Sequence, residues 1–120
     1  MKIDRETVFQ KYKGKCAYCG QPITMKSFQV DHIIPKERWH QHRALHILGL
    51  ELDGIENLNP TCRICNNWKH SFELEEFRKE LQRQVERARQ YSRNFRMAER
   101  YGMIVETGKL IRFHFETERN

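Results

Sequence analysis

Four cysteines form two pairs whose spacing defines their chemistry. In each pair two residues separate the cysteines, which are Cys16 and Cys19 in the first and Cys62 and Cys65 in the second. Two such pairs supply four soft thiolates, the donor set that suits a tetrahedral structural Zn²⁺. We see no apolar signal segment behind Met1 and therefore expect a reducing compartment, where disulfides are disfavoured. A thioredoxin-like redox pair is the alternative, but two pairs without a surrounding βαβ pattern argue against it.

A second group of polar residues lies between the cysteine pairs and just after them. Asp31 and His32 form an acid–imidazole dyad near the end of a predicted strand, where successive side chains point to opposite faces. Asn66 and His70 are one helical turn apart if the segment 63–70 is helical. Together with Asp31 they could form a site of carboxylate, amide oxygen and imidazole. Such a site suits a catalytic divalent cation such as Mg²⁺, Mn²⁺ or Ni²⁺.

The hydrophobic pattern predicts the elements that position these side chains. Alternating apolar and polar residues favour strands, and apolar residues spaced by three and four favour helices. In chain order we expect a short helix capped by Asp4, a strand over 28–35, a mixed connection over 36–56, a helix over 63–70, a long helix over 71–91 capped by Ser71, a helix over 93–101 and a β-hairpin over 103–116.

Length and charge bound the class of protein. The chain has 120 residues, with 22 Lys and Arg against 16 Asp and Glu, for a formal net charge of +6. This length predicts a single domain over 1–120. No apolar run approaches the ~20 residues that a membrane span needs, so we expect no membrane partner. An excess of basic charge favours an anionic partner, most often nucleic acid.

The motifs, taken in order, point to a known family. The succession C-x-x-C, Asp-His-Ile-Ile-Pro, Asn-Leu and C-x-x-C-Asn resembles the four-cysteine branch of the HNH endonucleases over about residues 9–80. The resemblance implies an α+β fold with a small zinc-stapled ββα-metal (His-Me finger) core. The helices and the hairpin over about 71–116 are then additions to that core.

The resemblance also implies a role for each residue of the site. His32 would be the general base, and Asn57 would hold the active-site loop and help to orient the base. Asp31, Asn66 and His70 would be the ligands of the catalytic divalent cation, and the four cysteines would hold the zinc. The implied activity is metal-dependent hydrolysis of DNA phosphodiester bonds, with RNA still open, leaving a 5′-phosphate and a 3′-hydroxyl.

Other basic and metal-ligating residues lie outside this set. We expect nucleic-acid contacts from four of them: Lys36, Arg38, Arg43 and Lys69. The histidines at 40, 42 and 46 could bind a second metal, although an exposed loop is the simpler interpretation. The basic row along the long helix is a solvated face by default, with phosphate binding as the alternative.

Two further functions remain open from the sequence. The first is a non-catalytic zinc module that binds nucleic acid through its basic surface. The second is a regulatory or toxin-like protein whose site is silent until a partner binds. A pure binding module does not need the set of Asp31, His32, Asn57 and Asn66, so this set favours the nuclease. We expect a cytoplasmic protein of bacterial or phage origin.

Overall fold

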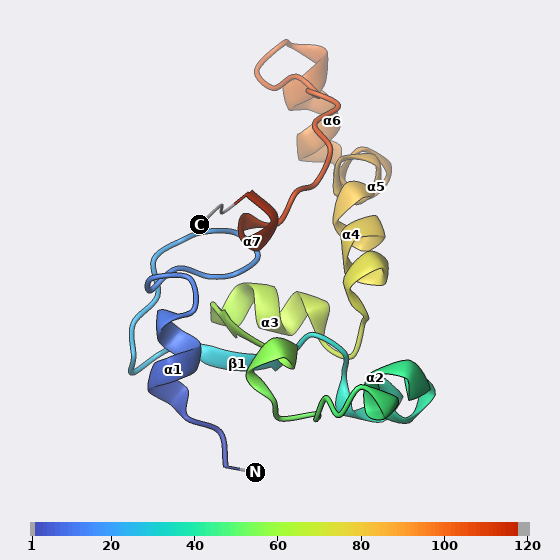
Figure 1. Cartoon of the computed structure of the whole chain (residues 1–120). Coiled ribbons are helices and arrows are strands. Elements are labelled where there is room, and N and C mark those ends of the chain that lie inside the picture. Colours follow the sequence, from blue (N-terminus) through green and yellow to red (C-terminus); the bar gives the residue numbers. More distant parts are fainter. Residues whose placement is uncertain (1, 118–120) are drawn as a thin grey trace.

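A two-stranded antiparallel sheet followed directly by a helix forms the centre of the fold. The computed structural model describes residues 2–117. Strand β1 (Gln29–His32) pairs with β2 (Leu58–Thr61) so that Asp31 lies opposite Asn59. Helix α3 (Arg63–Lys69) begins two residues after β2 and packs against β1 (Figure 1). This β–β–α order is the expected α+β arrangement, with a first strand shorter than the predicted 28–35.

Helix α1 (Arg5–Gln10) covers the other side of the sheet at β2. Its N-cap is Asp4, whose carboxylate accepts the main-chain N–H groups of Glu6 and Thr7 at 3.1 and 3.4 Å, as predicted. Val8 is buried and joins Phe28 and Leu58 in a small apolar cluster. This cluster fixes β2 from the side opposite the cysteine pairs.

The connection between the strands consists of short helical turns. It contains the 3₁₀ helix η1 (Lys36–Gln41), helix α2 (Arg43–Ile47) and the 3₁₀ helix η2 (Ile55–Asn57). Neither η1 nor α2 buries a residue. Figure 1 shows α2 projecting to one side of the β1–α3 region. The connection therefore forms a flap beside the sheet and adds little to the core.

The predicted long helix over 71–91 is in fact two helices, α4 (Leu74–Gln82) and α5 (Gln84–Tyr91). Helix α4 starts later than predicted because Glu73, rather than Ser71, is its N-cap, in a capping box with Glu76. The break lies at Arg83, whose backbone leaves the helical region at φ −91° and ψ 1°. There the side chain of Gln84 donates to the Glu80 carbonyl oxygen at 2.7 Å, which satisfies that helix end.

Helix α6 (Arg93–Arg100) begins at the cap Ser92 and ends before Gly102, close to the predicted range 93–101. The predicted β-hairpin over 103–116 is wrong. Residues 103–113 contain no strand, and the short helix α7 (His114–Thr117) follows them.

Contacts with helix α4 explain why the hairpin does not form. The side chain of Gln82 accepts from the main-chain N–H of Ile111 at 2.8 Å and donates to the Lys109 carbonyl at 2.9 Å. Arg78 donates to the Ile111 carbonyl at 2.9 Å. Side chains of α4 therefore bond to the main-chain groups of Lys109 and Ile111, which would pair with the other strand in a hairpin.

The main core lies where α4 and α7 meet the first cysteine pair. Tyr18, Phe77 and Phe113 are buried there with Cys16. The ring of Tyr18 meets those of Phe77 and Phe113 edge to face, with centroids 5.5 and 5.1 Å apart. Main-chain bonds from His114 to Tyr18 and from Phe115 to Ala17, at 3.0 and 2.9 Å, attach the end of the chain to this pair.

The outline of the molecule is extended because α5 and α6 stand away from this core. The radius of gyration is 17.0 Å, against about 14 Å for a compact chain of this length. Figure 1 shows α4, α5 and α6 leading outward from the β1–α3 region before the chain returns to α7. None of the helices within residues 2–117 is long and apolar enough to cross a membrane.

Candidate active site and metal centre

The four cysteines converge as the sequence predicts. Their sulfur atoms all lie within 4.8 Å of one another, and Sγ of Cys19 is 3.8 Å from Sγ of Cys62. A tetrahedral zinc ion with Zn–S bonds of ~2.3 Å places its sulfurs about 3.8 Å apart. The donor set and the spacing thus fit a structural zinc site.

Local hydrogen bonds shape each cysteine pair for this role. Cys62 is the N-cap of α3, and its sulfur accepts the main-chain N–H of Cys65 at 3.3 Å. In the first pair, the N–H of Gly20 donates to the Cys16 carbonyl at 3.0 Å while Gly20 adopts φ +78°. A hydrogen bond from Cys65 lowers the pKa of the Cys16 thiol to about 4. Burial raises the pKa of Cys19 to about 11, so the local bonds orient the four sulfur atoms toward one site, and a bound cation would favour their deprotonated form.

Asp31 lies on the buried face of β1, only 4% exposed. The Tyr18 hydroxyl donates to its Oδ2, and Nζ of Lys69 lies 3.2 Å from its Oδ1. Burial raises the pKa of Asp31, and the neighbouring ammonium group of Lys69 opposes this rise. Each carboxylate oxygen has two lone pairs, so one hydrogen bond to each still leaves room for a metal ion.

Lys69 is not the phosphate-contacting residue that we predicted. Its side chain is fully buried, and Nζ donates to the carbonyl oxygens of His32 and Ile33 at 2.9 and 3.1 Å in addition to Asp31. Burial lowers its pKa, against the opposing effect of Asp31. The ammonium group therefore ties α3 to the end of β1 and cannot reach a nucleic acid.

His32 follows Asp31 on the opposite, more open face of the strand. Its Nε2 lies 2.7 Å from Oδ1 of Asp53, a residue just before η2. Asp53 is not among the site residues predicted from the sequence, where it lies in the mixed connection over 36–56. A separation of 21 residues carries no periodic signal, and an acidic residue in a long connection has no distinguishing pattern.

Asn57 holds the loop that follows β1. Its side chain accepts the main-chain N–H of Ile34 at 2.9 Å and donates to the carbonyl oxygens of Ile34 and Leu52 at 3.2 and 3.1 Å. The amide thereby joins the segment after His32 to the segment that carries Asp53.

Asn66 and His70 lie one turn apart along α3, as expected. The main-chain N–H of His70 donates to the Asn66 carbonyl at 2.9 Å. The helix ends at His70, whose φ of +47° turns the chain toward α4. The Asn66 side-chain amide donates to Oε1 of Gln29, so its own oxygen is left available as a ligand.

One small cavity brings the predicted residues together. Its volume is about 170 Å³. The side chains around it include Asp31, His32, Asn66 and His70, together with Lys36 and Glu37 from the start of η1. A carboxylate, an amide and two imidazoles around one cavity can hold a hard cation and transfer a proton. Glu37 is a further acidic neighbour that the sequence did not reveal.

The histidines of the flap are occupied elsewhere. Nε2 of His42 lies 2.8 Å from Glu73, and Nε2 of His46 lies 2.9 Å from the Trp39 carbonyl oxygen, with the His46 ring stacked on Trp39. His40 is exposed. These contacts favour the interpretation of this segment as an ordinary loop and not as a second metal site.

The other predicted nucleic-acid contacts differ in their surroundings. Lys36 and Arg43 are exposed, whereas Arg38 is paired with Glu73 and Glu76. Lys36 also borders the cavity that contains His32. Lys36 and Arg43 are therefore the better placed to meet an anionic ligand.

Comparison with known proteins agrees with this arrangement. The family model described as "HNH endonuclease" matches residues 16–72. That range contains both cysteine pairs, both strands and helix α3. None of the curated proteins compared with this chain matches it. Residues 16–72, which carry the paired strands and helix α3, thus form a segment of the HNH endonuclease type.

Proposed function

We propose that this protein is a metal-dependent endonuclease that hydrolyses DNA phosphodiester bonds. The observation that carries the proposal is the cavity shared by Asp31, His32, Asn66 and His70. The family match supports a nuclease, and the net charge of +6 suits a polyanionic substrate.

His32 is the proposed general base. Asp53 accepts a hydrogen bond from Nε2, which assigns the ring proton to that nitrogen and leaves the lone pair on Nδ1. A neutral imidazole of this tautomer can take a proton from water near neutral pH. Asn57 and Asp53 are positioning residues, since they fix the loop and the ring.

Asp31, Asn66 and His70 are the proposed ligands of a divalent cation. Their carboxylate, amide and imidazole donors fit Mg²⁺, Mn²⁺ or Ni²⁺. Such an ion, when bound, neutralises charge on the phosphate and on the departing oxygen. Tyr18 and Lys69 hold the Asp31 carboxylate in place, so the ligand is oriented before any ion arrives. Because Lys69 also offsets the charge of Asp31, we expect the ion to be held weakly.

A zinc module that binds nucleic acid without cleaving it is the competing function. One observation favours it: Asp31 is buried and satisfied by Tyr18 and Lys69, as a purely structural carboxylate would be. A structural Asp31 predicts that removing it changes stability alone, whereas a ligand predicts a changed metal requirement.

Plasmid nicking across a panel of divalent ions tests the proposal. Wild type should cleave with Mg²⁺, Mn²⁺ or Ni²⁺, and mild chelation should abolish cleavage while the folded, zinc-loaded protein survives. His32→Ala should lower the rate by about 10²–10⁴-fold with unchanged zinc content. His40→Ala is the matched control, because His40 is an exposed histidine outside the cavity.

The metal titration separates the two functions. Asp31→Ala should not be rescued by added ions, and His70→Ala should need a higher ion concentration than wild type. Circular dichroism checks that both variants remain folded. A wild-type rate from a nuclease-free His32→Ala preparation, or a wild-type titration curve from Asp31→Ala, would refute the proposed site.

A further inference from the structure

The arm, which we define as residues 83–110, has no role in the proposed site. It comprises α5, α6 and the segment that returns toward α7. None of its side chains is buried, so it does not complete the core. Two of its aromatic residues, Tyr91 and Tyr101, are 78% and 74% exposed. The arm therefore presents its side chains to solvent rather than to the core.

Positive charge dominates the helical part of the arm. Between residues 83 and 101 the sequence has six arginines and two glutamates, a net charge of +4. The arginines are at positions 83, 87, 89, 93, 96 and 100. The whole chain carries +6, so most of the excess charge lies on this small element.

Internal contacts use only some of these arginines. Arg87 pairs with Glu80 at 2.6 Å, and Arg89 makes a two-pronged pair with Glu99 at 2.8 and 2.7 Å. Arg96 donates to the main-chain oxygen of Arg89 at 2.9 Å. The bonds of Arg89 and Arg96 hold α5 against α6, and the pair of Arg87 with Glu80 joins α5 to α4.

Arg93 and Arg100 differ from these three. Both are exposed, and neither guanidinium group makes a hydrogen bond or an ion pair with any residue among 2–117. Like-charged, unpaired guanidinium groups repel one another when no anion lies between them. The presence of both arginines on one short helix is explained if a binding partner supplies an anion.

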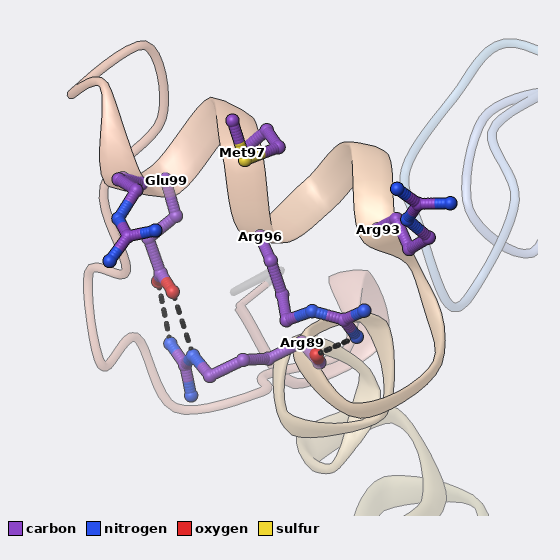
Figure 2. Close-up of a pocket in the computed structure, with 6 residues that line it drawn as sticks. Arg89, Arg93, Arg96, Met97 and Glu99 are labelled. Carbon is purple, nitrogen blue, oxygen red and sulfur yellow. Dashed lines mark hydrogen bonds and ion pairs between the residues drawn. The ribbon is translucent and has the colours of Figure 1, made fainter.

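The arginines surround a hollow between α5 and α6. A cavity of about 480 Å³ is lined by Arg89, Arg93, Arg96 and Arg100, with Met97 and the single acid Glu99. Figure 2 shows Arg96 reaching from α6 toward α5, with Arg93 beyond it at the end of the group and free of dashed contacts. Planar guanidinium groups donate two parallel hydrogen bonds to a phosphate.

The spacing on α6 suits a repeating anion. Arg93, Arg96 and Arg100 are separated by three and four residues and share one face. They span about 10 Å of helix axis, the rise of about three nucleotides along one DNA strand. The molecule is 54 Å along its longest axis, the length of about 16 base pairs of duplex.

We propose that the arm binds the phosphate backbone of duplex DNA through Arg93, Arg96 and Arg100, at a distance from the cleavage site. This inference rests on the proposed function for its substrate. The arm then supplies affinity without base contacts, and the duplex must extend beyond the cleaved bond to gain it.

Fluorescence anisotropy with the His32→Ala protein tests this directly, since binding is measured without cleavage. The test variant adds Arg93→Gln and Arg100→Gln, which remove charge and break no internal bond. The matched control adds Lys13→Gln and Lys26→Gln, two exposed lysines near the N-terminus. Each protein is titrated with duplexes of 10 and 30 base pairs at several salt concentrations.

The arm variant should bind the 30-base-pair duplex on the order of tenfold more weakly at low salt. Its slope of log affinity against log salt should fall by about 2, because two phosphate contacts are lost. The control should stay within twofold, and the 10-base-pair duplex should show a much smaller difference between variants. Charge reversal, Arg93→Glu with Arg100→Glu, should enlarge every effect.

Equal affinity and slope for the arm variant and its parent would overturn the inference. The inference would also be overturned if the arm variant bound RNA or an acidic peptide more weakly than its parent but bound DNA equally well. A failure of the proposed function looks different: wild type would then cleave no DNA with any ion, whatever the anisotropy shows. Cleavage by wild type with unchanged binding by the arm variant would reject the arm alone.

Discussion

The core around the first cysteine pair and the arm (residues 83–110) are stabilised by different kinds of contact. The first has buried aromatic rings, a four-sulfur cluster and a buried ion pair between Asp31 and Lys69. The arm has no buried side chain and is held by partly exposed ion pairs such as Arg89 with Glu99. A rigid region suits groups that must be positioned for chemistry, whereas an exposed region suits contacts with a long, regular polymer.

Removing one zinc ligand should have the largest effect. Cys62→Ser should strip the metal and unfold the domain, because Cys62 both caps α3 and belongs to the sulfur cluster. Elemental analysis and near-ultraviolet circular dichroism measure the loss. Ile64→Ser, at an exposed neighbour of the same helix, should keep both zinc and fold. Zinc-free wild-type protein with an intact fold would contradict this prediction.

A truncation in the aromatic core should come next. Phe77→Ala should lower the free energy of unfolding by about 3–5 kcal/mol, since the ring is fully buried between Tyr18 and Phe113. In the arm, Met97→Ala should change it by less than about 0.5 kcal/mol, because Met97 is half exposed. Urea denaturation compares the two. Equal losses would show that the arm shares the core.

A pH test examines the clamp between α4 and the end of the chain. Glu116 pairs with Arg78 at 2.7 Å, and hydrogen bonds from Arg78 hold the pKa of Glu116 below its usual 4.5. A carboxylate whose pKa is lower in the folded state than in the unfolded state stabilises the fold at pH values above its unfolded-state pKa. This stabilisation is lost as the pH falls through the folded-state pKa.

Wild type should therefore exceed Glu116→Gln in stability by about 1 kcal/mol at pH 6. The difference should shrink steadily below about pH 4.5. Denaturation midpoints for both proteins, taken at each pH, measure it. Comparison at the same pH cancels any loss of zinc in acid. A difference that stays constant down to pH 3 would exclude this contribution from Glu116.

The smallest global effect should come from the arm's own ion pairs. Glu99→Gln weakens the contact of Arg89 with α6, so the arm should open more often while the rest of the fold stays intact. Limited trypsin digestion should cut at the arm arginines several-fold faster, with an unchanged urea midpoint. Asn94→Asp, at an exposed position of the same helix, is the control and should not accelerate cutting. A lowered urea midpoint would tie the arm to global stability.

The sequence predicted features with local signatures. The cysteine spacing predicted the sulfur cluster, Asp4 predicted the start of α1, and the helical pattern over 93–101 predicted α6. Each depends on residues a few positions apart, so a single sequence contains it. The motif order around Asp31 and His32 identified the family for the same reason.

The features that were missed depend on residues far apart. A lysine at a helix end is normally solvated, and Lys69 is buried because its partners lie on and after β1, with Asp31 38 residues away. Asp53 reaches His32 across 21 residues. The sequence contains neither Pro nor Gly at the break at Arg83. The helix ends there because a side-chain hydrogen bond from Gln84 replaces a main-chain bond to Glu80. The predicted hairpin does not form because side chains of α4 bond to its main chain at Lys109 and Ile111.

Tyr18 has a consequence for moving this site into another protein. It stands between the two cysteines of the first pair, and its hydroxyl reaches Asp31. A graft of β1, β2 and α3 with His70 onto a new scaffold would keep every proposed ligand and lose this support for the carboxylate. The first cysteine pair would have to be transferred as well, even where the host is stable without metal. For protein engineering, the smallest portable unit is therefore the segment from the first cysteine pair to His70.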